Sequence, residues 1–471
     1  MGIFDKYKKA VIIGMLAFGG SGAASSAADL GDVFKAAASQ LPDKLTWKGV
    51  TLYGVVDVGY GYTTSGAPVG GAYWGINSLA YATPAGQRPI SALPNTQGLS
   101  FFGIKFEEEI GGGWKAIGDF KGGFNPLTGQ LDDMCAARVA NNGKPASQQT
   151  VHGQGARCGD LFNGGAWIGL TNQAFGTFSI GKQTSLSGEL MYQYDAQNKL
   201  PSLSLLLWET PGIPPWDFRW NNSVKWAYQN GPFHAAVMYA QGGQDSGMHG
   251  DGYGGTIGAN WQSFSIDAVY QKMNSAVSSS VFGVGACGVT GTPSCSTLKV
   301  TAANVYDVGL MSRYTYDFGD RAWGGKLSFN AGYQFSSYST PSNPISVGDT
   351  GLGGYTFGSV NNTAYAYGSL NANTFWVGAN YQNGPWSFIA AYYLWKPDFY
   401  KNSPTSIFCS TSVAPNCAGS MNTASASVIY TADKHLDVYA GYVWSDLHGG
   451  LAFGFPTTNV NTFLSGLIFR F

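Results

Sequence analysis

The chain ends in the stretch NTFLSGLIFRF, residues 461–471, in which apolar side chains recur at every second position. Successive side chains of an extended chain point to opposite faces, so this period indicates a β-strand with one apolar face. That face carries Phe463, Ser465, Leu467, Phe469 and Phe471. The opposite face, with Gly466 and Arg470, is mixed. Because an apolar residue at the end of a chain is seldom left in water, we expect this strand to lie in an apolar environment.

The N-terminal residues 1–28 have the features of a secretory signal peptide. Lys6, Lys8 and Lys9 precede the apolar run AVIIGMLAFGG, and the small-residue stretch SGAASSAA follows it. A membrane-anchoring helix is the alternative, but the apolar run is too short to span a bilayer. Residues 29–45 then form a short N-terminal segment, which could be an amphipathic helix ended by Pro42.

The composition of the remaining chain excludes several classes of protein. Without residues 1–28 it has 23 basic and 26 acidic residues, a net charge of about −3, and no strongly basic stretch, so we expect no nucleic-acid partner. No apolar run reaches the length of a membrane-spanning helix. Aromatic residues make up 15% of the chain and charged residues only 11%, which disfavours both disorder and an ordinary soluble domain.

Alternating segments recur along the whole of residues 46–471. They lie at 49–62, 98–110, 114–124, 163–171, 175–182, 219–229, 232–241, 252–262, 263–274, 303–318, 322–337, 371–382, 385–397, 422–432, 435–446 and 461–471, about sixteen in all. Short connections such as YQNGPF alternate with long ones rich in Gly, Ser, Asn and Thr. An even number of strands with short turns at one rim and long loops at the other is typical of an all-β transmembrane antiparallel barrel.

A secreted lectin or propeller is the main structural alternative. A propeller would repeat a blade signature, and none is found in the sequence. A sandwich of this size would need a second apolar face, yet most strands carry Gly, Asp, Lys, Asn or Ser there. The sequence therefore favours a single closed barrel over residues 46–471, in which every backbone amide is paired within the membrane.

The six cysteines form three couples that are close in sequence: Cys135 with Cys158, Cys287 with Cys295, and Cys409 with Cys417. Each couple lies in a long loop, so in an oxidising compartment we expect three disulfides that each close one loop. A zinc site is the alternative, but CxxC pairs are absent from the sequence and the nearby His152 is isolated. We expect neither a metal ion nor a cofactor.

Four further stretches carry a family resemblance: VTLYGVVDVGYG at 50–61, LSFFGIKFEEEIGGGWKAIGDF at 99–120, FNGGAWIGLTNQAFGTFSIGKQ at 162–183 and NNSVKWAYQNGPF at 221–233. Together with the terminal phenylalanine, they resemble the general diffusion porins of Gram-negative bacteria, especially the neisserial and burkholderial type. The resemblance implies a sixteen-stranded barrel in the outer membrane, usually a homotrimer embedded in lipid and lipopolysaccharide. It implies passive diffusion of ions and small hydrophilic solutes. It also implies that Phe471 is the signal read by the outer-membrane insertion machinery.

The same resemblance assigns the pore constriction to the third loop, within residues 183–218. Its apolar LSLLLW stretch should pack against a lumen wall rather than lie in water. Its acidic residues, which would give the loop a negative side, are Glu189, Asp195, Glu209 and Asp217. An ordinary set of solvated loop acids is the alternative interpretation.

Basic residues are expected on the lumen wall that faces this loop. The candidates are Lys105, Lys115, Lys121, Lys182, Arg219 and Lys225. Opposed acids and bases across a narrow slot would create a transverse field that orients polar solutes. Two positions depart from the family pattern, because Phe101 and Gly164 stand where the family carries arginine. The basic wall is thus thinner than is usual in the family, and each lysine could also be an ordinary wetted wall residue.

Three other functions are alternatives to a general porin. An outer-membrane barrel enzyme would need a nucleophile with an oriented histidine, but no GxSxG motif is present in the sequence. Of the histidines, only His234 lies in the middle of a strand, where we expect it to face the lumen alone. A channel selective for a sugar or a carboxylate is a closer alternative, and an adhesin is supported only by long loops. We therefore expect no catalytic residues.

The cysteine pairing gives a direct test. Peptide mapping of the exported protein under non-reducing conditions should link Cys135 to Cys158, Cys287 to Cys295 and Cys409 to Cys417. Linkages between different loops, or free thiols, would contradict this assignment.

Overall fold

The computed structural model describes residues 45–64, 90–94, 100–131, 160–198, 200–206, 219–243, 248–279, 298–319, 324–346, 350–352, 355–401, 418–449 and 458–471. The signal peptide and the possible N-terminal helix predicted for residues 1–45 lie outside these ranges, apart from Leu45. All six cysteines also lie outside them. Within the described ranges, no helix is both long and apolar enough to cross a membrane.

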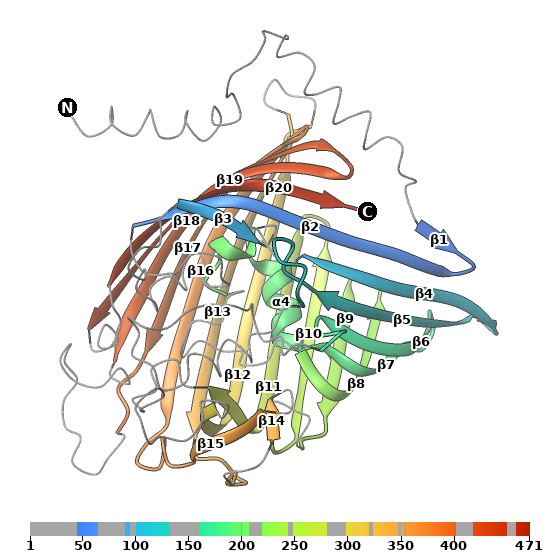
Figure 1. Ribbon diagram of the computed structural model, residues 1–471. Helices are drawn as coiled ribbons and strands as arrows, with labels where there is room; N and C mark the ends of the chain where they lie inside the picture. The colour runs from blue at the N-terminus through green and yellow to red at the C-terminus, as the bar shows by residue number, and fades with distance from the viewer. Residues whose placement is uncertain are drawn as a thin grey trace, which may run out of the picture.

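The alternating segments form one closed antiparallel sheet (Figure 1). Its sixteen long strands are β2 (Val50–Thr63), β4 (Phe101–Gly111), β5 (Trp114–Gly123), β6 (Gly165–Asn172), β7 (Gly176–Thr184), β8 (Arg219–Asn230), β9 (Phe233–Ala240), β10 (Gly252–Trp261), β11 (Phe264–Ser279), β12 (Leu298–Asp317), β13 (Lys326–Ser339), β16 (Leu370–Asn383), β17 (Trp386–Pro397), β18 (Gly419–Asp433), β19 (Leu436–Gly449) and β20 (Asn459–Arg470). Each corresponds to one predicted segment, which confirms the sixteen-stranded barrel.

The sheet closes where the first long strand meets the last. Strands β2 and β20 pair antiparallel from Val55 opposite Arg470 to Thr63 opposite Thr462. Beyond Arg470, the backbone of Phe471 exchanges two hydrogen bonds with Gly54. The terminal residue is therefore part of the closing seam, which leaves no free sheet edge in the membrane.

Alternation separates an outer face from an inner face, as the C-terminal stretch predicts. On β20, Phe463 and Leu467 lie on the outer surface, whereas Leu464 and Ile468 are buried inside the barrel. The inner face of β18 presents small polar residues, including Thr423, Ser425 and Ser427. The outer surface is thus apolar enough to meet lipid, and the inner surface is largely polar.

Four short strands were not predicted from the sequence. β1 (Leu45–Trp47) and β3 (Ile90–Pro94) both pair with β2, and β14 (Thr350–Leu352) pairs with β15 (Tyr355–Asn361). Strand β15 also pairs in parallel with the start of β12. Each is only three to seven residues long, too short for an alternation signal to stand out.

The segment after β7 turns into the barrel instead of leaving it (Figure 1). Helix α4 (Leu186–Tyr194) begins at Ser185, whose hydroxyl accepts a hydrogen bond from the Gly188 N–H at 3.2 Å. The helix contacts β9, β10, β11, β12 and β13, and the 3₁₀ helix η3 (Pro201–Leu203) contacts β19. Residues 185–198 and 200–206, here called the inner segment, therefore lie against the lumen wall.

The apolar core of the protein lies between the inner segment and the wall. Leu186, Met191 and Leu203 have 1% or less of their surface exposed, and the nearby Leu205 and Leu206 are equally buried. The wall supplies apolar side chains from β16 to β20, with Trp376 and Tyr393 among the largest. The described part of the LSLLLW stretch is thus packed as predicted, because burying such side chains removes a large apolar area from water.

The closing seam can be tested by deleting Phe471. The deletion removes a bond from the Gly54 N–H to the Phe471 carbonyl (3.0 Å) and one from the Phe471 N–H to the Gly54 carbonyl (3.1 Å). Each such bond stabilises by about 1 kcal/mol, so the detergent-folded barrel should unfold a few degrees lower, measured by heat-dependent gel mobility. Phe471→Leu keeps both bonds and serves as the control. A deletion variant as stable as the native chain would contradict this closure.

Candidate functional site: the pore lining

The inner segment covers one part of the lumen wall and leaves the other part uncovered. It packs on the half made by β9 to β13 and β16 to β19, where the lumen-facing side chains become buried. The inner faces of β2, β4, β5, β6 and β8 stay partly exposed and carry most of the predicted basic residues. This partly exposed half of the barrel is here called the open wall.

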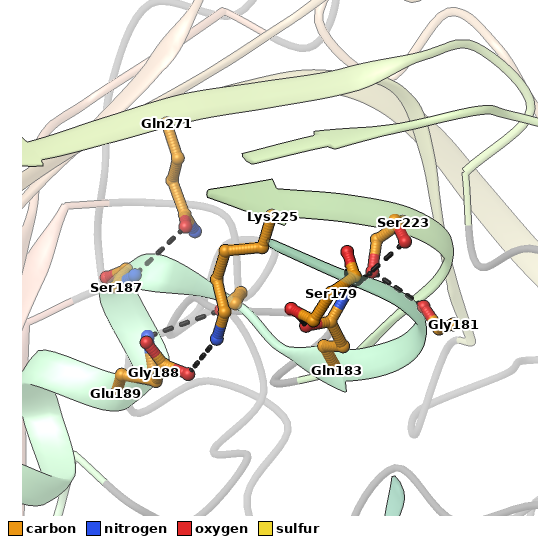
Figure 2. A network of polar contacts seen from close by, with 10 residues as sticks. Ser179, Gly181, Gln183, Ser187, Gly188, Glu189, Ser223, Lys225 and Gln271 are labelled. Atoms are coloured by element: carbon orange, nitrogen blue, oxygen red, sulfur yellow. Dashed lines mark hydrogen bonds and ion pairs between the residues drawn. The ribbon is translucent and has the colours of Figure 1, made fainter. Parts of the chain in front are cut away.

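Glu189 and Lys225 are in direct contact across the lumen (Figure 2). Lys225 lies on β8 opposite Ser179 of β7 and faces inward, and its Nζ is 2.5 Å from Oε1 of Glu189. Glu189 lies in the first turn of α4, where a carboxylate interacts favourably with the helix dipole. An acid and a base that were expected to oppose each other across the pore thus form one ion pair.

Two amide side chains fix the entry to α4 (Figure 2). Gln183 accepts a hydrogen bond from the Ser179 hydroxyl at 2.5 Å and donates to the Ser223 hydroxyl at 3.2 Å. Gln271 of β11 accepts a hydrogen bond from the Ser187 N–H at 3.1 Å. These glutamines were not predicted as site residues. Their place on the inward face of alternating strands was the available signal, because a buried amide needs partners.

Asp195 has a different setting from Glu189. It ends α4, has 1% of its surface exposed and is surrounded by donors. Its carboxylate accepts hydrogen bonds from the Tyr393 hydroxyl at 2.5 Å, the Gln197 N–H at 2.9 Å and the Ser204 hydroxyl. Burial raises the pKa of the Asp195 carboxyl, and the three donors oppose that rise. The porin resemblance implied a position on the pore side of the loop, but Asp195 lies against β17.

His234 faces the lumen as expected, but it is not alone. Its Nε2 lies 2.6 Å from Oδ1 of Asp267, and the Tyr194 hydroxyl donates to the other oxygen of that carboxylate at 2.5 Å. The Arg313 guanidinium lies 5.6 Å from the centre of the Tyr194 ring. Because Tyr194 is the last residue of α4, this cluster attaches the helix end to the wall.

Lys105 and Lys121 lie on the open wall beside the aromatic ring of Tyr53. The Tyr53 ring lies against Gly103 of β4, where a side chain would overlap it, and its hydroxyl donates to Asp119 of β5. The ammonium of Lys105 is 5.3 Å from the centre of this ring, and that of Lys121 is 5.7 Å from it. These distances are within the range of cation–π attraction.

The remaining basic candidates have local partners. Lys115, beside the turn between β4 and β5, is 2.7 Å from Glu107 and 3.0 Å from Glu109. Lys182 pairs with Ala166 of β6 and lies on the same side of β7 as the outward-facing Ile180. Its ammonium is 3.7 Å from Asp160. Arg219 donates from Nε to the Gly164 carbonyl at 2.7 Å. The two other acidic candidates, Glu209 and Asp217, lie outside the described residues.

The charges of the pore lining are therefore arranged mainly as neighbouring pairs. Lys225 pairs with Glu189, Lys115 with Glu107, and Lys121 lies 3.8 Å from Asp119. Lys105 differs, since its only charge-related contact among the described residues is with the Tyr53 ring. Paired charges of opposite sign largely cancel each other's field at a distance.

Comparison with known proteins places this architecture in a family. The family model described as Gram-negative porin matches residues 10–450. The chain belongs to the Gram-negative porin family. Its barrel is accordingly that of an outer-membrane porin, and the porin resemblance of the sequence is confirmed.

Individual relatives are distant. An outer membrane porin protein of Bordetella pertussis is 25% identical over 146 residues, a match that spans 31% of this chain and 31% of that relative. The fold is similar to that of an anion-selective porin from Comamonas acidovorans, at 15% identity and a TM-score of 0.53, over 90% of this porin and 99% of that chain. The fold is also similar to that of a loop-deletion mutant of OmpT, an outer membrane protein of Vibrio cholerae, at 13% identity and a TM-score of 0.52. That match covers 90% of this porin and 99% of the OmpT chain.

The Glu189–Lys225 pair can be tested by a double-mutant cycle. Glu189→Gln leaves the Lys225 ammonium unpaired, so the reversal potential of the purified porin in a KCl gradient should shift toward anions. Lys225→Gln should shift it toward cations, and the double variant should return close to the native value. A unit charge about 4 Å from a passing ion contributes about 1 kcal/mol in bulk water and more in a narrow pore. An unchanged reversal potential in both single variants would place the pair outside the conducting path.

Proposed function

We propose that this porin is an open, water-filled channel for passive diffusion of ions and small hydrophilic solutes. One observation carries the proposal: the inner segment is packed onto one side of the lumen and leaves the open wall accessible. Residues of the open wall such as Lys105 and Tyr53 keep part of their surface exposed, whereas those beneath α4 are buried. A lumen of this kind is narrowed without being plugged.

The pairing of charges supports weak rather than strong ion selectivity. Of the proposed constriction groups, Glu189 is balanced by Lys225, and Asp195 is removed from the lumen by burial. Glu209 and Asp217 remain proposed members of the acidic side. On the basic side, Lys105, Lys121 and Arg219 are the groups that we assign to the solute path, while Lys115 and Lys182 serve local ion pairs.

An enzymatic role finds no support in the geometry of the lumen. The His234–Asp267 pair has the spacing of an oriented base. The other oxygen of Asp267, however, accepts a hydrogen bond from the Tyr194 hydroxyl at the end of α4. No serine hydroxyl among the described contacts lies next to His234. We therefore assign this cluster to the attachment of the inner segment and assign no catalytic residue.

The outer surface supports a proposal about the assembly. We propose a homotrimer in the outer membrane, embedded in lipid and lipopolysaccharide. The apolar outer face, with Leu52, Tyr60 and Ile257 exposed, would contact both lipid and neighbouring copies. We also propose that the C-terminal strand is the element read by the insertion machinery, and its last residue, Phe471, supports this by pairing with Gly54 at the closing seam.

The test of the channel is recording in planar bilayers. The purified full-length porin should produce stepwise, ohmic conductance that increases with salt concentration without saturating, and its selectivity between K⁺ and Cl⁻ should be weak. Unheated gels of the cross-linked protein should show a trimer. Absence of conductance from folded, inserted protein would refute the open channel.

A further inference from the structure

We propose that the open wall around Lys105 and Lys121 binds organic anions with a flat apolar body, the class of aromatic carboxylates. The inference rests on the proposed channel and adds a solute class to it. It depends on five residues from three adjacent strands: Tyr53 of β2, Phe101 and Lys105 of β4, and Asp119 and Lys121 of β5. They are here called the lysine–aromatic patch.

The strand register brings these residues together. Tyr53 of β2 lies opposite Gly103 of β4, which lies opposite Lys121 of β5, so all three occupy one row on the inner face. Gly103 has no side chain, and the Tyr53 ring therefore spans it and reaches Asp119 with its hydroxyl. The ring is held flat along the wall by a contact that any larger residue at position 103 would prevent.

Phe101 adds a second aromatic surface beside the same lysine. Its ring meets that of Tyr53 edge to face, with centroids 5.7 Å apart and an angle of 71° between the planes. The Lys121 ammonium is 4.8 Å from the Phe101 centroid. Both rings are only partly buried, so apolar surface is presented to the solute path next to positive charge.

The two departures from the family pattern meet at this place. Phe101 lies under the Lys121 ammonium, and a β-carbon on Gly164 would come within 3.0 Å of the Lys121 side chain. Where the family pattern has arginine at both positions, this porin has one aromatic ring and one glycine, and the Lys121 side chain packs against that glycine. Charge is thereby exchanged for apolar surface, which favours anions with an apolar part over small inorganic anions.

The charges of the patch favour an anion. Two ammonium groups, those of Lys105 and Lys121, lie near the Tyr53 ring, and the one carboxylate of the patch, Asp119, accepts the Tyr53 hydroxyl and lies 3.8 Å from Lys121. Lys105 is exposed and has no carboxylate partner among the described residues. A solute carboxylate bound there would gain a charge-assisted hydrogen bond, while its ring would contact Phe101 and Tyr53.

Blocking of the single-channel current tests the proposal with three probes. Sodium benzoate carries the ring and the charge, sodium acetate the charge alone, and benzylammonium chloride the ring with the opposite charge. With the native full-length porin in planar bilayers, benzoate should reduce the current at a concentration about tenfold lower than acetate, and benzylammonium should not block in this range. Equal potency of benzoate and acetate, or of benzoate and benzylammonium, would overturn the proposal.

Variants separate the contributions of charge and ring. Lys105→Gln should raise the half-blocking benzoate concentration by about tenfold, the loss expected for one charge-assisted hydrogen bond. Phe101→Ser should weaken block by benzoate but not by acetate, and should leave the reversal potential in KCl unchanged. Lys326→Gln is the matched control, because Lys326 lies on β13 in an exposed ion pair with Asp317.

Two further outcomes distinguish this inference from the channel itself. If Lys105→Gln and Lys326→Gln behave alike, the lysine–aromatic patch does not bind the probe, although the channel remains. If the native protein inserts but conducts no ions, the proposed channel is wrong, and the inference that rests on it is wrong as well. An open channel that shows no preference for benzoate overturns the present inference alone.

Discussion

Pairing of every backbone amide in hydrocarbon is the constraint on which the rest of this structure depends. It forces the sixteen strands to close between β2 and β20, and it makes the final residue part of the seam through Gly54. A closed sheet of this size encloses more space than its own inward side chains can fill. The inner segment occupies one side of that space, and the lumen on the other side becomes the solute path.

Most of the fold could be predicted from the sequence because a barrel strand has a local signature. Alternation along each strand reports its two faces, and Phe463 and Leu467 are on the outer surface as the pattern indicates. Short strands such as β3 and β15 lack this signature, since they exist through pairing with β2 and β12. Helix α4 likewise has no clear local signature in the sequence, because its nine residues are stabilised by contacts with the wall.

The candidate site was less predictable, because loop residues have no alternation to show which way they point. Glu189 and Asp195 are six positions apart and chemically alike, yet one contacts Lys225 in the lumen and the other is buried against Tyr393. The supporting polar residues could have been found from the strands. Asp57 faces inward in its alternating strand and accepts a hydrogen bond from Tyr439 at 2.6 Å, as a buried carboxylate requires a donor.

We infer that buried polar contacts hold the inner segment against the wall and so set the width of the pore. This is tested by the single-channel conductance of the double variant Asp195→Ala, Gln197→Ala, which removes the bonds to Tyr393, Ser425 and Ser427. A folded barrel that carries both substitutions should give a larger and noisier conductance, whereas Asp398→Ala, at an exposed position after β17, should not change it. If the folded double variant conducts like the native porin, these contacts do not set the width of the pore.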